Sequence, residues 1–414
     1  MVRKEKVRFF VVLVLFPLLA LWFGGCAGLA PRPYRATRIP LIRVKIVSDS
    51  PSIQIASQKA LLFKEGARVI FKWKGKPPVI VSVTPSGKVA LKQAGTRMIF
   101  KADSFKIESP NRKSIAVNGR HYRGSVWLFQ NPTGNFSVVN EVDLESYVRG
   151  VVPVEIGRGS RQILEALKAQ AVAARTYAYR RVKKTKGVLE ATVSDQVYGG
   201  ADAESSWTNR AVEATLGEIL TYEGEPIYAF YSSTCGGRTE PVADVWPKIR
   251  APYLKGVADN FGQGDFCRAS PHYRWVELWS GSELDSLLRA ELTAKGAYKP
   301  VWGRVTDLRV LRRFPSGRIR DLEIDFQRGK TILHGNGLRW LLKPSNRPLL
   351  RSTLCRFVTY RKSGELRAVL VVGAGNGHGV GMCQWGAMGM AKAGYNYSQI
   401  LGHYYRGAKI RRVY

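Results

Sequence analysis

The chain has 414 residues and a formal net charge of +34 at pH 7, since it contains 65 Lys and Arg but only 31 Asp and Glu. A hydrophobic content of 45% and an aromatic content of 11% exclude disorder as the main state, and the presence of a single long apolar run excludes a multi-span membrane protein. The charge indicates a polyanionic partner, which composition alone leaves open between nucleic acid, anionic lipid and acidic polysaccharide.

Residues 1–26 have the layout of a secretory signal peptide. Basic residues precede an apolar run from Phe9 to Phe23, which is too short for a comfortable transmembrane helix. The run ends at Gly-Gly-Cys-Ala, which resembles a bacterial lipobox and predicts that Cys26 is lipidated. Ordinary cleavage nearby and an uncleaved anchor are the alternatives. All three place the mature chain outside the cytoplasm, so we expect an exported lipoprotein of the bacterial envelope and no nucleic-acid partner. Ala27 after the lipidated cysteine favours the outer membrane.

The remaining four cysteines fit an exported protein. An even number in an oxidising compartment predicts up to two disulfides, with three possible pairings. A zinc site is the rival interpretation, but no pair has the close two-residue spacing of a metal knuckle. We therefore favour disulfides and expect no required cofactor, with zinc as the weaker alternative. The candidates are Cys235, Cys267, Cys355 and Cys383.

Residues 27–40 are rich in Pro, Arg and Ala and are expected to form a tether. From 41 to 139, short runs alternate apolar and polar residues between turn sequences, which predicts a β-rich N-terminal domain. The clearest predicted strands cover residues 42–47, 79–83 and 125–129.

Residues 140–414 have a mixed texture and are expected to form a catalytic region of helices and sheets. Apolar residues at helical spacing predict a helix over 160–184, with Ser160 as its N-cap. Further predicted helices cover 208–216, 281–295, 384–392 and a short stretch from 398, and a predicted hairpin joins 218–222 to 227–231. A mixed insert is expected at about 273–360. The predicted fold class is therefore α+β.

Glu155 is the first candidate for chemistry, because it lies between an apolar run and the predicted long helix. Desolvation would raise the pKa of its carboxyl group, whereas free N–H groups at a helix start would lower it. A raised pKa suits a general acid. The alternative is a Glu at a helix N-terminus that only complements the helix dipole.

Two further segments contain residue types suited to binding. Lys168 and Arg175 lie seven residues apart on one helical face, where two cations can hold a carboxylate, although an ordinary solvated face has the same pattern. His378 lies among many glycines in residues 375–387, which permit close backbone approach by a ligand or anion binding at a helix start. The alternative for His378 is a structural histidine.

These three segments, in this order, resemble the stage II sporulation protein D and LytB (amidase enhancer) family. Residues 117–124, 231–240, 251–254, 317–318 and 351–353 fit the same pattern, so the resemblance extends from about residue 40 to the C-terminus. Characterised members of this family are lytic transglycosylases that cut peptidoglycan glycan strands. The resemblance implies the same activity here, with glycan strands as the substrate and a peptidoglycan amidase that acts first as the functional partner.

The resemblance also implies roles for single residues. Glu155 matches the catalytic acid/base, which would act without a second carboxylate because the sugar's own C6 hydroxyl is the nucleophile. Many relatives carry His where this chain has Ser232, so a contribution of that His would be lost or replaced. Some relatives bind zinc, which keeps Cys235 and Cys267 as candidate ligands. The residues expected to bind or support the substrate are Lys168, Gln170, Arg175, Ser232, His378 and Gln384.

Two rival functions remain open at this point. One is a non-catalytic module that binds glycan and enhances a partner amidase, which would need no poised carboxyl group. The other is a thiol amidase with Cys235 as nucleophile and His378 as base, which requires the two side chains to lie within hydrogen-bond reach.

Overall fold

The computed structural model describes residues 38–414 except 76, 186, 261 and 263. The predicted signal peptide, the lipidation site Cys26 and most of the predicted tether lie outside these residues. Within the described part of the chain, no helix is long and apolar enough to cross a bilayer. A β-rich N-terminal region is followed by a region of mixed helices and strands, so the α+β prediction is confirmed.

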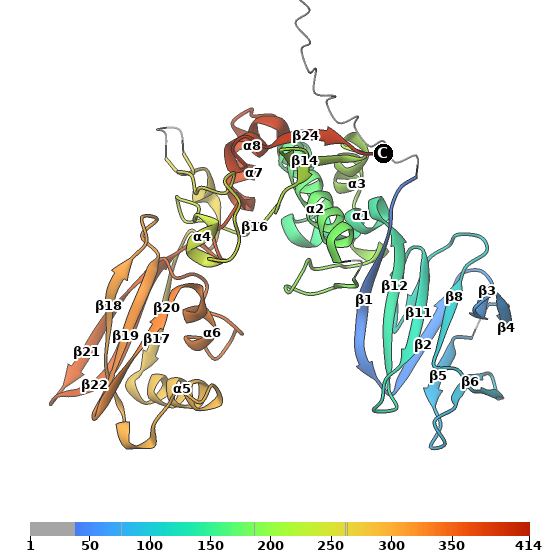
Figure 1. Cartoon of the computed structure of the whole chain (residues 1–414), viewed down its shortest axis with the longest axis horizontal. Coiled ribbons are helices and arrows are strands. Elements are labelled where there is room, and N and C mark those ends of the chain that lie inside the picture. Colours follow the sequence, from blue (N-terminus) through green and yellow to red (C-terminus); the bar gives the residue numbers. More distant parts are fainter. Residues whose placement is uncertain (1–37, 76, 186, 261, 263) are drawn as a thin grey trace, which may run out of the picture. The chain divides into compact units, whose positions relative to one another are not determined.

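Two mainly antiparallel sheets build the N-terminal part (Figure 1). The larger sheet has the strand order β13-β1-β12-β11-β8-β3-β4, and the smaller has the order β10-β9-β2-β5-β6-β7. The strands are β1 (Leu41–Ser50), β2 (Ser52–Ser57), β3 (Leu61–Glu65), β4 (Arg68–Trp73), β5 (Val79–Val83), β6 (Val89–Gln93), β7 (Thr96–Phe100), β8 (Ser104–Glu108), β9 (Ile115–Val117), β10 (Arg120–Tyr122), β11 (Ser125–Gln130), β12 (Phe136–Asp143) and β13 (Leu189–Glu190). The three predicted strands correspond to β1, β5 and β11.

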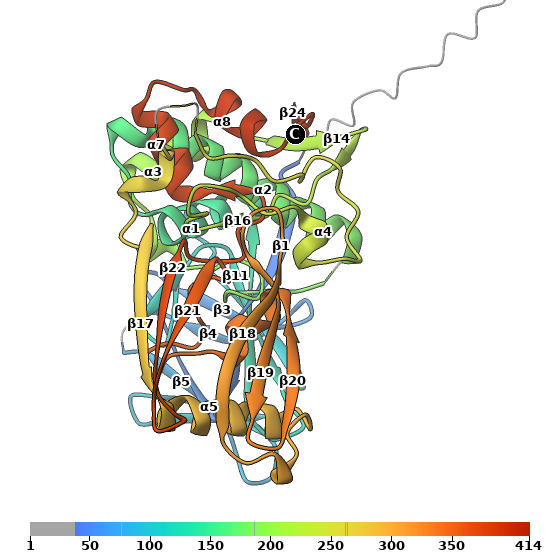
Figure 2. The same ribbon diagram turned by 90° about the vertical axis from the view of Figure 1, so that its left-hand side faces the viewer.

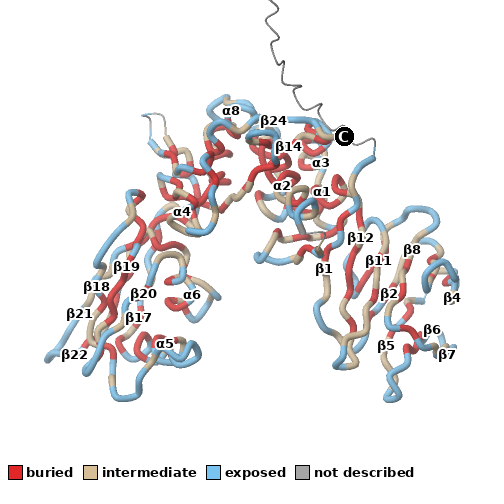
Figure 3. Tube along the Cα trace, in the orientation of Figure 1, coloured by how far each residue is buried: buried red, intermediate tan, exposed pale blue. Residues whose placement is uncertain are grey.

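The two sheets share one hydrophobic core, because strands of both contribute fully buried apolar side chains. In β11, Val126 and Leu128 are buried, whereas the residues on either side of each are only partly buried. This alternation is the period of two expected of a strand with one face on a core. The rings of Phe63 and Phe105 stack at 6.2 Å inside it. Figure 3 shows the buried stretches of β11 and β12. The boundary expected at 139/140 falls inside β12, and the same core continues into the helices that follow.

Three helices follow the N-terminal sheets, and they pack against one another through small side chains. They are α1 (Leu144–Ile156), α2 (Leu164–Thr185) and α3 (Ser206–Ala214). Asp143 caps α1, because its Oδ1 atom accepts the N–H of Ser146 at 2.9 Å. The predicted long helix is confirmed, although a short 3-10 helix, η1 (Arg161–Ile163), precedes α2 and Ser160 makes no side-chain capping bond. Most of the alanines of α2 are fully buried, which lets this helix lie close to α1 and α3.

The rest of the core consists of short elements from both sides of the insert. They are β14 (Glu218–Tyr222), β15 (Glu225–Pro226), β16 (Tyr231–Ser232), α4 (Val242–Val245), β23 (Met382–Cys383), α7 (Gln384–Lys392), α8 (Tyr397–Tyr404) and β24 (Lys409–Arg412). The predicted hairpin forms only in part, since β15 has two residues and ends at Pro226, which has no N–H with which to extend the ladder. Tyr231 and Ser232 pair instead with β23, in parallel.

The insert runs from Arg274 to Ala374 and is therefore longer than the predicted 273–360. Its elements are β17 (Arg274–Ser280), α5 (Gly281–Ala294), β18 (Val305–Arg313), β19 (Ile319–Phe326), β20 (Gly329–His334), α6 (Leu338–Leu341), β21 (Cys355–Lys362) and β22 (Glu365–Ala374). They form two three-stranded sheets, β17-β22-β21 and β18-β19-β20, around a hydrophobic core of their own (Figure 2).

Candidate active site

Glu155 lies in the last turn of α1, whose buried face packs on the core through Tyr147, Val148, Val151 and Val152. We expected this carboxylate just before a helix, and that expectation is wrong because the chain is already helical from Leu144 onward. A position at the end of a helix rather than at its start changes the electrostatic environment of the Glu155 carboxyl group. The last turn of a helix presents free carbonyl groups and the negative end of its dipole, which disfavours an ionised carboxylate.

The carboxyl group of Glu155 is largely enclosed by neutral groups. The backbone N–H of Val197 donates to its Oε1 atom at 2.9 Å, and the polar side chains of Gln384 and Tyr231 lie close enough to lower the pKa of the carboxyl group. Burial nevertheless raises the pKa of Glu155, because desolvation outweighs the effect of these three polar groups, which favour the ionised carboxylate. The group is therefore set up to hold a proton more readily than an exposed glutamate, which is the property of a general acid.

A second layer of hydrogen bonds orients Tyr231. Gln196 donates its Nε2 hydrogen to the Tyr231 hydroxyl oxygen at 2.8 Å, and its Oε1 atom accepts from the hydroxyl of Tyr147 at 3.2 Å. Because the Tyr231 oxygen accepts from Gln196, its own hydrogen is free to be donated to Glu155. Gln196, Val197 and Tyr231 were not foreseen from the sequence, since a neutral glutamine, a backbone amide and a tyrosine carry no distinctive pattern.

Gln170 and Ser232, two residues expected to support the substrate, lie close to Gln384. Gln384 Nε2 lies 3.5 Å from Gln170 Oε1, and Ser232 pairs in register with Cys383, the residue before Gln384. Gln170 Nε2 and Ser232 Oγ are buried polar atoms without a hydrogen-bond partner among the described residues. Both are donors, so they offer hydrogen bonds to a polar ligand next to the carboxyl group.

Arg175 does not face this site. Its guanidinium is fully buried and makes two parallel bonds to Glu145, at 2.7 Å from Nε to Oε1 and 2.8 Å from Nη2 to Oε2. It also donates to the carbonyl oxygen of Glu218 at 3.0 Å. A substrate carboxylate cannot reach it, so the prediction that Arg175 binds substrate is wrong. Its role is to tie α2 to α1 and β14.

Lys168 is also occupied by a protein partner. Its Nζ atom lies 2.6 Å from Oε1 of Glu165, one turn earlier on α2, and 5.7 Å from the ring centroid of Tyr397. The backbone N–H of Tyr397 in turn donates to the other oxygen of Glu165. Lys168 therefore links α2 to α8, and a contact with substrate stays a prediction.

The glycine-rich segment around His378 is shaped by contacts within the protein. A Cβ atom on Gly379 would lie 2.4 Å from Nη2 of Arg318, and one on Gly381 would lie 2.0 Å from the carbonyl oxygen of Phe230. Both glycines have positive φ. The close approach that we expected of a ligand is therefore made by the chain itself.

His378 is held neutral inside this segment. Its Nδ1 atom accepts the N–H of Val380 at 3.0 Å, and its ring centroid lies 5.0 Å from that of Trp246. Burial and the nearby Arg339 and Arg318 lower the pKa of His378 to about 3. Cys235 is fully buried against other cysteines, so the geometry gives no support to a thiol amidase built on Cys235 and His378.

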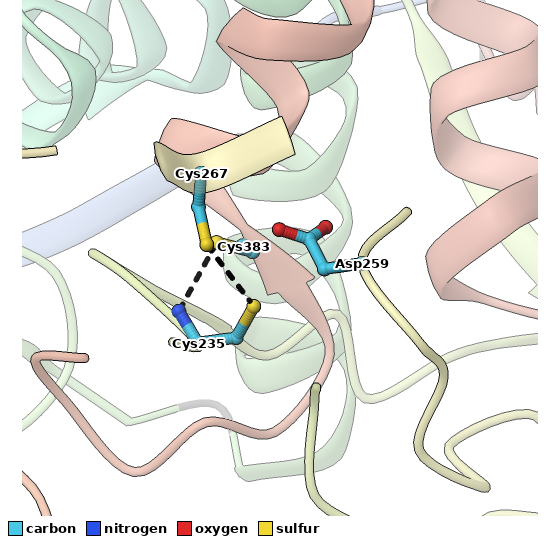
Figure 4. Close-up of side chains that lie close together, drawn as sticks. All are labelled: Cys235, Asp259, Cys267 and Cys383. Carbon is cyan, nitrogen blue, oxygen red and sulfur yellow. Dashed lines mark hydrogen bonds between the residues drawn. The ribbon is translucent and has the colours of Figure 1, made fainter. Parts of the chain in front are cut away.

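Three of the four described cysteines gather in one place, and the fourth lies elsewhere. Cys235, Cys267 and Cys383 lie with Asp259 in a buried cluster (Figure 4), whereas Cys355 belongs to the core of the insert. All four are free thiols, so the expectation of two disulfides is wrong. Two disulfides would require Cys355 to join a member of the cluster, which its place in the second core prevents.

Positive charge lines a cavity of about 540 Å³ at the edge of the insert. Its polar side chains include four arginines, none of which forms an ion pair within the described residues. Two of them, Arg274 and Arg313, donate hydrogen bonds to backbone carbonyl oxygens. Glu155 is not among the residues that line it. The arginines are Arg238, Arg274, Arg313 and Arg356.

Known proteins are similar to this chain in sequence. A family model described as Stage II sporulation protein matches residues 132–222, which include α1 and α2. Stage II sporulation protein D of Bacillus amyloliquefaciens is 33% identical over 342 residues, which cover 78% of this chain and 87% of that protein. The chain belongs to the stage II sporulation protein D family.

Two further relatives show the breadth of the stage II sporulation protein D family. An uncharacterised protein of Brachyspira hyodysenteriae is 35% identical over 300 residues, which cover 72% of this chain and 74% of that protein. The Amidase enhancer of Bacillus subtilis is 31% identical over 370 residues and 78% of this chain, but the match covers only 49% of that protein, so this chain spans about half its length. A second family model, a domain of unknown function, matches residues 260–381 and thus the insert.

Proposed function

We propose that this chain is a peptidoglycan lytic transglycosylase in which Glu155 is the single general acid/base. The observation that carries the proposal is the environment of Glu155. Its carboxyl group is desolvated, its pKa is raised, and only neutral groups hydrogen-bond to it. No Lys or Arg pairs with it in the described part of the chain, so no neighbouring cation holds the carboxylate ionised.

The reaction uses the same group twice. Protonated Glu155 gives its proton to the oxygen that bridges C1 of N-acetylmuramic acid and N-acetylglucosamine, and the C1–O bond breaks. The ionised carboxylate then takes the proton of the C6 hydroxyl of the same muramic acid, whose oxygen closes a 1,6-anhydro ring at C1. The nucleophile is part of the substrate, which replaces a bimolecular attack by water with an intramolecular one. Glu155 ends the cycle protonated.

The neutral hydrogen-bond donors around Glu155 suit a group that alternates between a protonated and an ionised form. When Glu155 is protonated, its burial is inexpensive; when it is ionised, the Val197 N–H and the side chains of Tyr231 and Gln384 stabilise the charge. Preorganised donors of this kind need no rearrangement during the reaction. The unpaired Ser232 Oγ and Gln170 Nε2 are proposed to bind sugar hydroxyl or acetamido groups.

We propose that the substrate is glycan from which the stem peptides have been removed. The lactyl group of muramic acid then carries a free carboxylate, which complements the net charge of +34 and the arginine-lined cavity. An amidase that acts first would supply this substrate. Binding of stripped strands should weaken as salt is raised, and binding that is insensitive to salt would count against the proposal.

The alternative function is a non-catalytic enhancer of an amidase, which the name of the Bacillus subtilis relative suggests. Incubation of peptide-stripped glycan with the purified protein alone distinguishes the transglycosylase function from the enhancer function. A transglycosylase releases fragments with 1,6-anhydromuramic acid ends, which mass spectrometry detects. An enhancer leaves the stripped glycan intact and only accelerates peptide release by an added amidase.

We further propose that the chain is exported and anchored through lipidated Cys26, which the sequence predicts. Mass spectrometry of the protein extracted from the envelope would find the lipid on the new N-terminus, and a Cys26→Ala variant would appear in the soluble fraction. An unmodified Cys26 in the extracted protein would contradict the anchor.

A further inference from the structure

We propose that the outer face of the β17-β22-β21 sheet in the insert is a docking surface for a partner protein that presents apolar side chains beside a carboxylate group. The apolar side chains cover the sheet face, and the carboxylate enters the arginine-lined cavity at one end of it. Glu155 contributes neither to this sheet nor to the cavity, and the proposal does not rest on the reaction proposed for that residue.

The pairing register of the three strands defines the outer face (Figure 2). Leu278 of β17, Leu370 of β22 and Val358 of β21 stand opposite one another in one row across the sheet. Because residues two apart on a strand point to the same side, the neighbouring rows belong to the same face. These rows are Val276, Val372 and Arg356 on one side and Ser280, Ala368 and Tyr360 on the other.

The outer face is apolar and open. The exposed fraction is 64% for Val276, 68% for Leu278 and 61% for Tyr360, and Val358 and Leu370 are also exposed. Contiguous exposed apolar side chains of this kind mark an interaction site. The opposite face of the sheet is covered, because it contributes buried side chains to the core of the insert, namely Trp275, Trp279, Val369 and Val371.

The second sheet of the insert shows how a solvated face is built in the same region of the chain. In the β18-β19-β20 sheet, Arg309 stands opposite Glu323, and Lys330 stands opposite Asp325. Arg309 and Lys330 both form ion pairs with Glu323, at 3.0 and 2.9 Å. Charged pairs thus keep this face in water, whereas the outward rows of the β17-β22-β21 sheet are mainly apolar. The apolar face is therefore a specific feature of one sheet.

Positive charge adjoins the apolar face at one end. Arg274 and Arg356 point outward from β17 and β21 and line the cavity of about 540 Å³, together with Arg238 and Arg313. Val372 of the central strand lines it too, so the cavity and the face are continuous. The four guanidinium groups form no ion pairs within the described residues. A carboxylate that enters this cavity meets donors suited to charge-assisted, bidentate hydrogen bonds.

Charge argues against the chain itself as the occupant. A second copy would bring the same arginines to the interface, and like charges that face each other oppose association. Residues 1–37, which precede the described part of the chain, contain one acidic residue, Glu5, against six basic ones. The occupant is therefore an acidic segment of another molecule.

The architecture of the sheet favours a protein over a bilayer or a glycan strand. Within the described residues, β17 and β21 are the two edges of the sheet, so one side of each presents backbone N–H and C=O groups without a partner strand. Such groups are too costly to place in hydrocarbon, but a protein can hydrogen-bond to them. A glycan strand can offer carboxylates to the cavity, but its hydroxyl-rich rings gain little by covering aliphatic side chains.

Peptide selection on the full chain gives the first test. A phage-displayed library of random twelve-residue peptides is selected on the purified protein, and the enriched sequences are synthesised. We expect them to combine alternating apolar residues with a nearby Asp or Glu, and to bind the wild type in fluorescence anisotropy. A library that yields no such peptide would overturn the proposal.

Substitutions on the two sheets locate the binding surface. Leu278→Asp and Arg356→Glu should each weaken binding of the selected peptide at least tenfold. Ile332→Asp and Arg328→Glu, at exposed positions of β20 and of the turn before it, are the matched controls and should leave the affinity unchanged. A peptide with Lys in place of its acidic residue should recover affinity for Arg356→Glu. Equal affinity of all four variants would contradict the docking surface.

The other occupants are tested with Leu278→Asp. Sedimentation velocity, binding to phosphatidylglycerol vesicles and binding to peptide-stripped glycan are compared with the wild type, and the variant should match it in all three. A loss of self-association, vesicle binding or glycan binding would assign the face to a second copy, a bilayer or glycan, and would overturn the proposal. Release of anhydro ends by the chain alone should also be unchanged, which separates this test from that of Glu155.

Discussion

Gln384, at the start of α7, lies close enough to the carboxyl group of Glu155, in the last turn of α1, to lower the pKa of that carboxyl group. The two residues lie on opposite sides of the insert in the sequence, and the β16–β23 pair places Gln384 beside Tyr231 and Ser232. The surroundings of the Glu155 carboxyl group therefore include residues from both sides of the insert in the sequence.

Gln384→Ala is expected to raise the pKa of Glu155 further, since the amide of Gln384 stabilises the ionised carboxylate. A general acid must be protonated in the free enzyme, so activity falls as pH rises through this pKa. The alkaline limb of the profile of kcat/KM against pH should therefore move to higher pH. Tyr231→Phe should move it in the same direction. An unchanged limb in both variants would contradict the positioning role of these side chains.

Glu155→Gln should make the stability of the protein less dependent on pH. The folded-state pKa of Glu155 lies above the value of 4.5 for an unperturbed glutamate because of burial, so the folded state binds the proton more tightly than the unfolded state. The stability that protonation contributes is fully present below about pH 4.5 and is lost as pH rises through the folded-state pKa. Urea unfolding at a series of pH values should therefore show that, as pH rises through this range, the stability of the Glu155→Gln variant increases relative to that of the wild type. If the difference in unfolding free energy between the two proteins stayed constant with pH, Glu155 would have the pKa of a solvent-exposed glutamate, which would contradict its burial.

The sequence singled out Glu155 by its setting among apolar residues as well as by family resemblance, whereas Gln170, Ser232 and Gln384 were expected to support the substrate through the resemblance alone. Periodicity found α2 and α7, because their apolar residues recur at helical spacing. It missed α1 as the helix that carries Glu155, since Pro153 and several β-branched residues disguise a helix that tertiary packing stabilises. Helix propensity is a weak guide to conformation where tertiary packing stabilises the helix.

Arg175→Ala should destabilise the protein by about 3–5 kcal/mol, because it leaves Glu145 buried without its charge partner. Lys183→Ala is the control on the same helix, since Lys183 pairs with Glu225 at 3.4 Å on the surface and is expected to cost less than about 1 kcal/mol. Urea denaturation measures both. A small loss of stability in Arg175→Ala together with weakened glycan binding would instead favour the ligand role first expected of this residue.

Lys168 and Arg175 do share one helical face, as the spacing of seven requires. The sequence does not reveal what covers that face, because Glu145 and Glu218 reach Arg175 from other elements, while Lys168 pairs with Glu165 of the same helix. The cysteines illustrate the same limit. Their even number suggested disulfides, whereas the fold separates Cys355 from the other three and adds Asp259, which no spacing rule connects to them.

The most direct test of the account is digestion of purified, peptide-stripped glycan by the wild type, Glu155→Gln and Glu213→Gln. Glu213 is an exposed residue of α3 and serves as the matched control. The wild type and Glu213→Gln should release fragments with 1,6-anhydromuramic acid ends, and Glu155→Gln should lose about 100-fold to 10,000-fold in rate, the usual contribution of general acid/base catalysis, while its far-UV circular dichroism stays unchanged. An equal yield of anhydro ends from Glu155→Gln would contradict the assignment of Glu155.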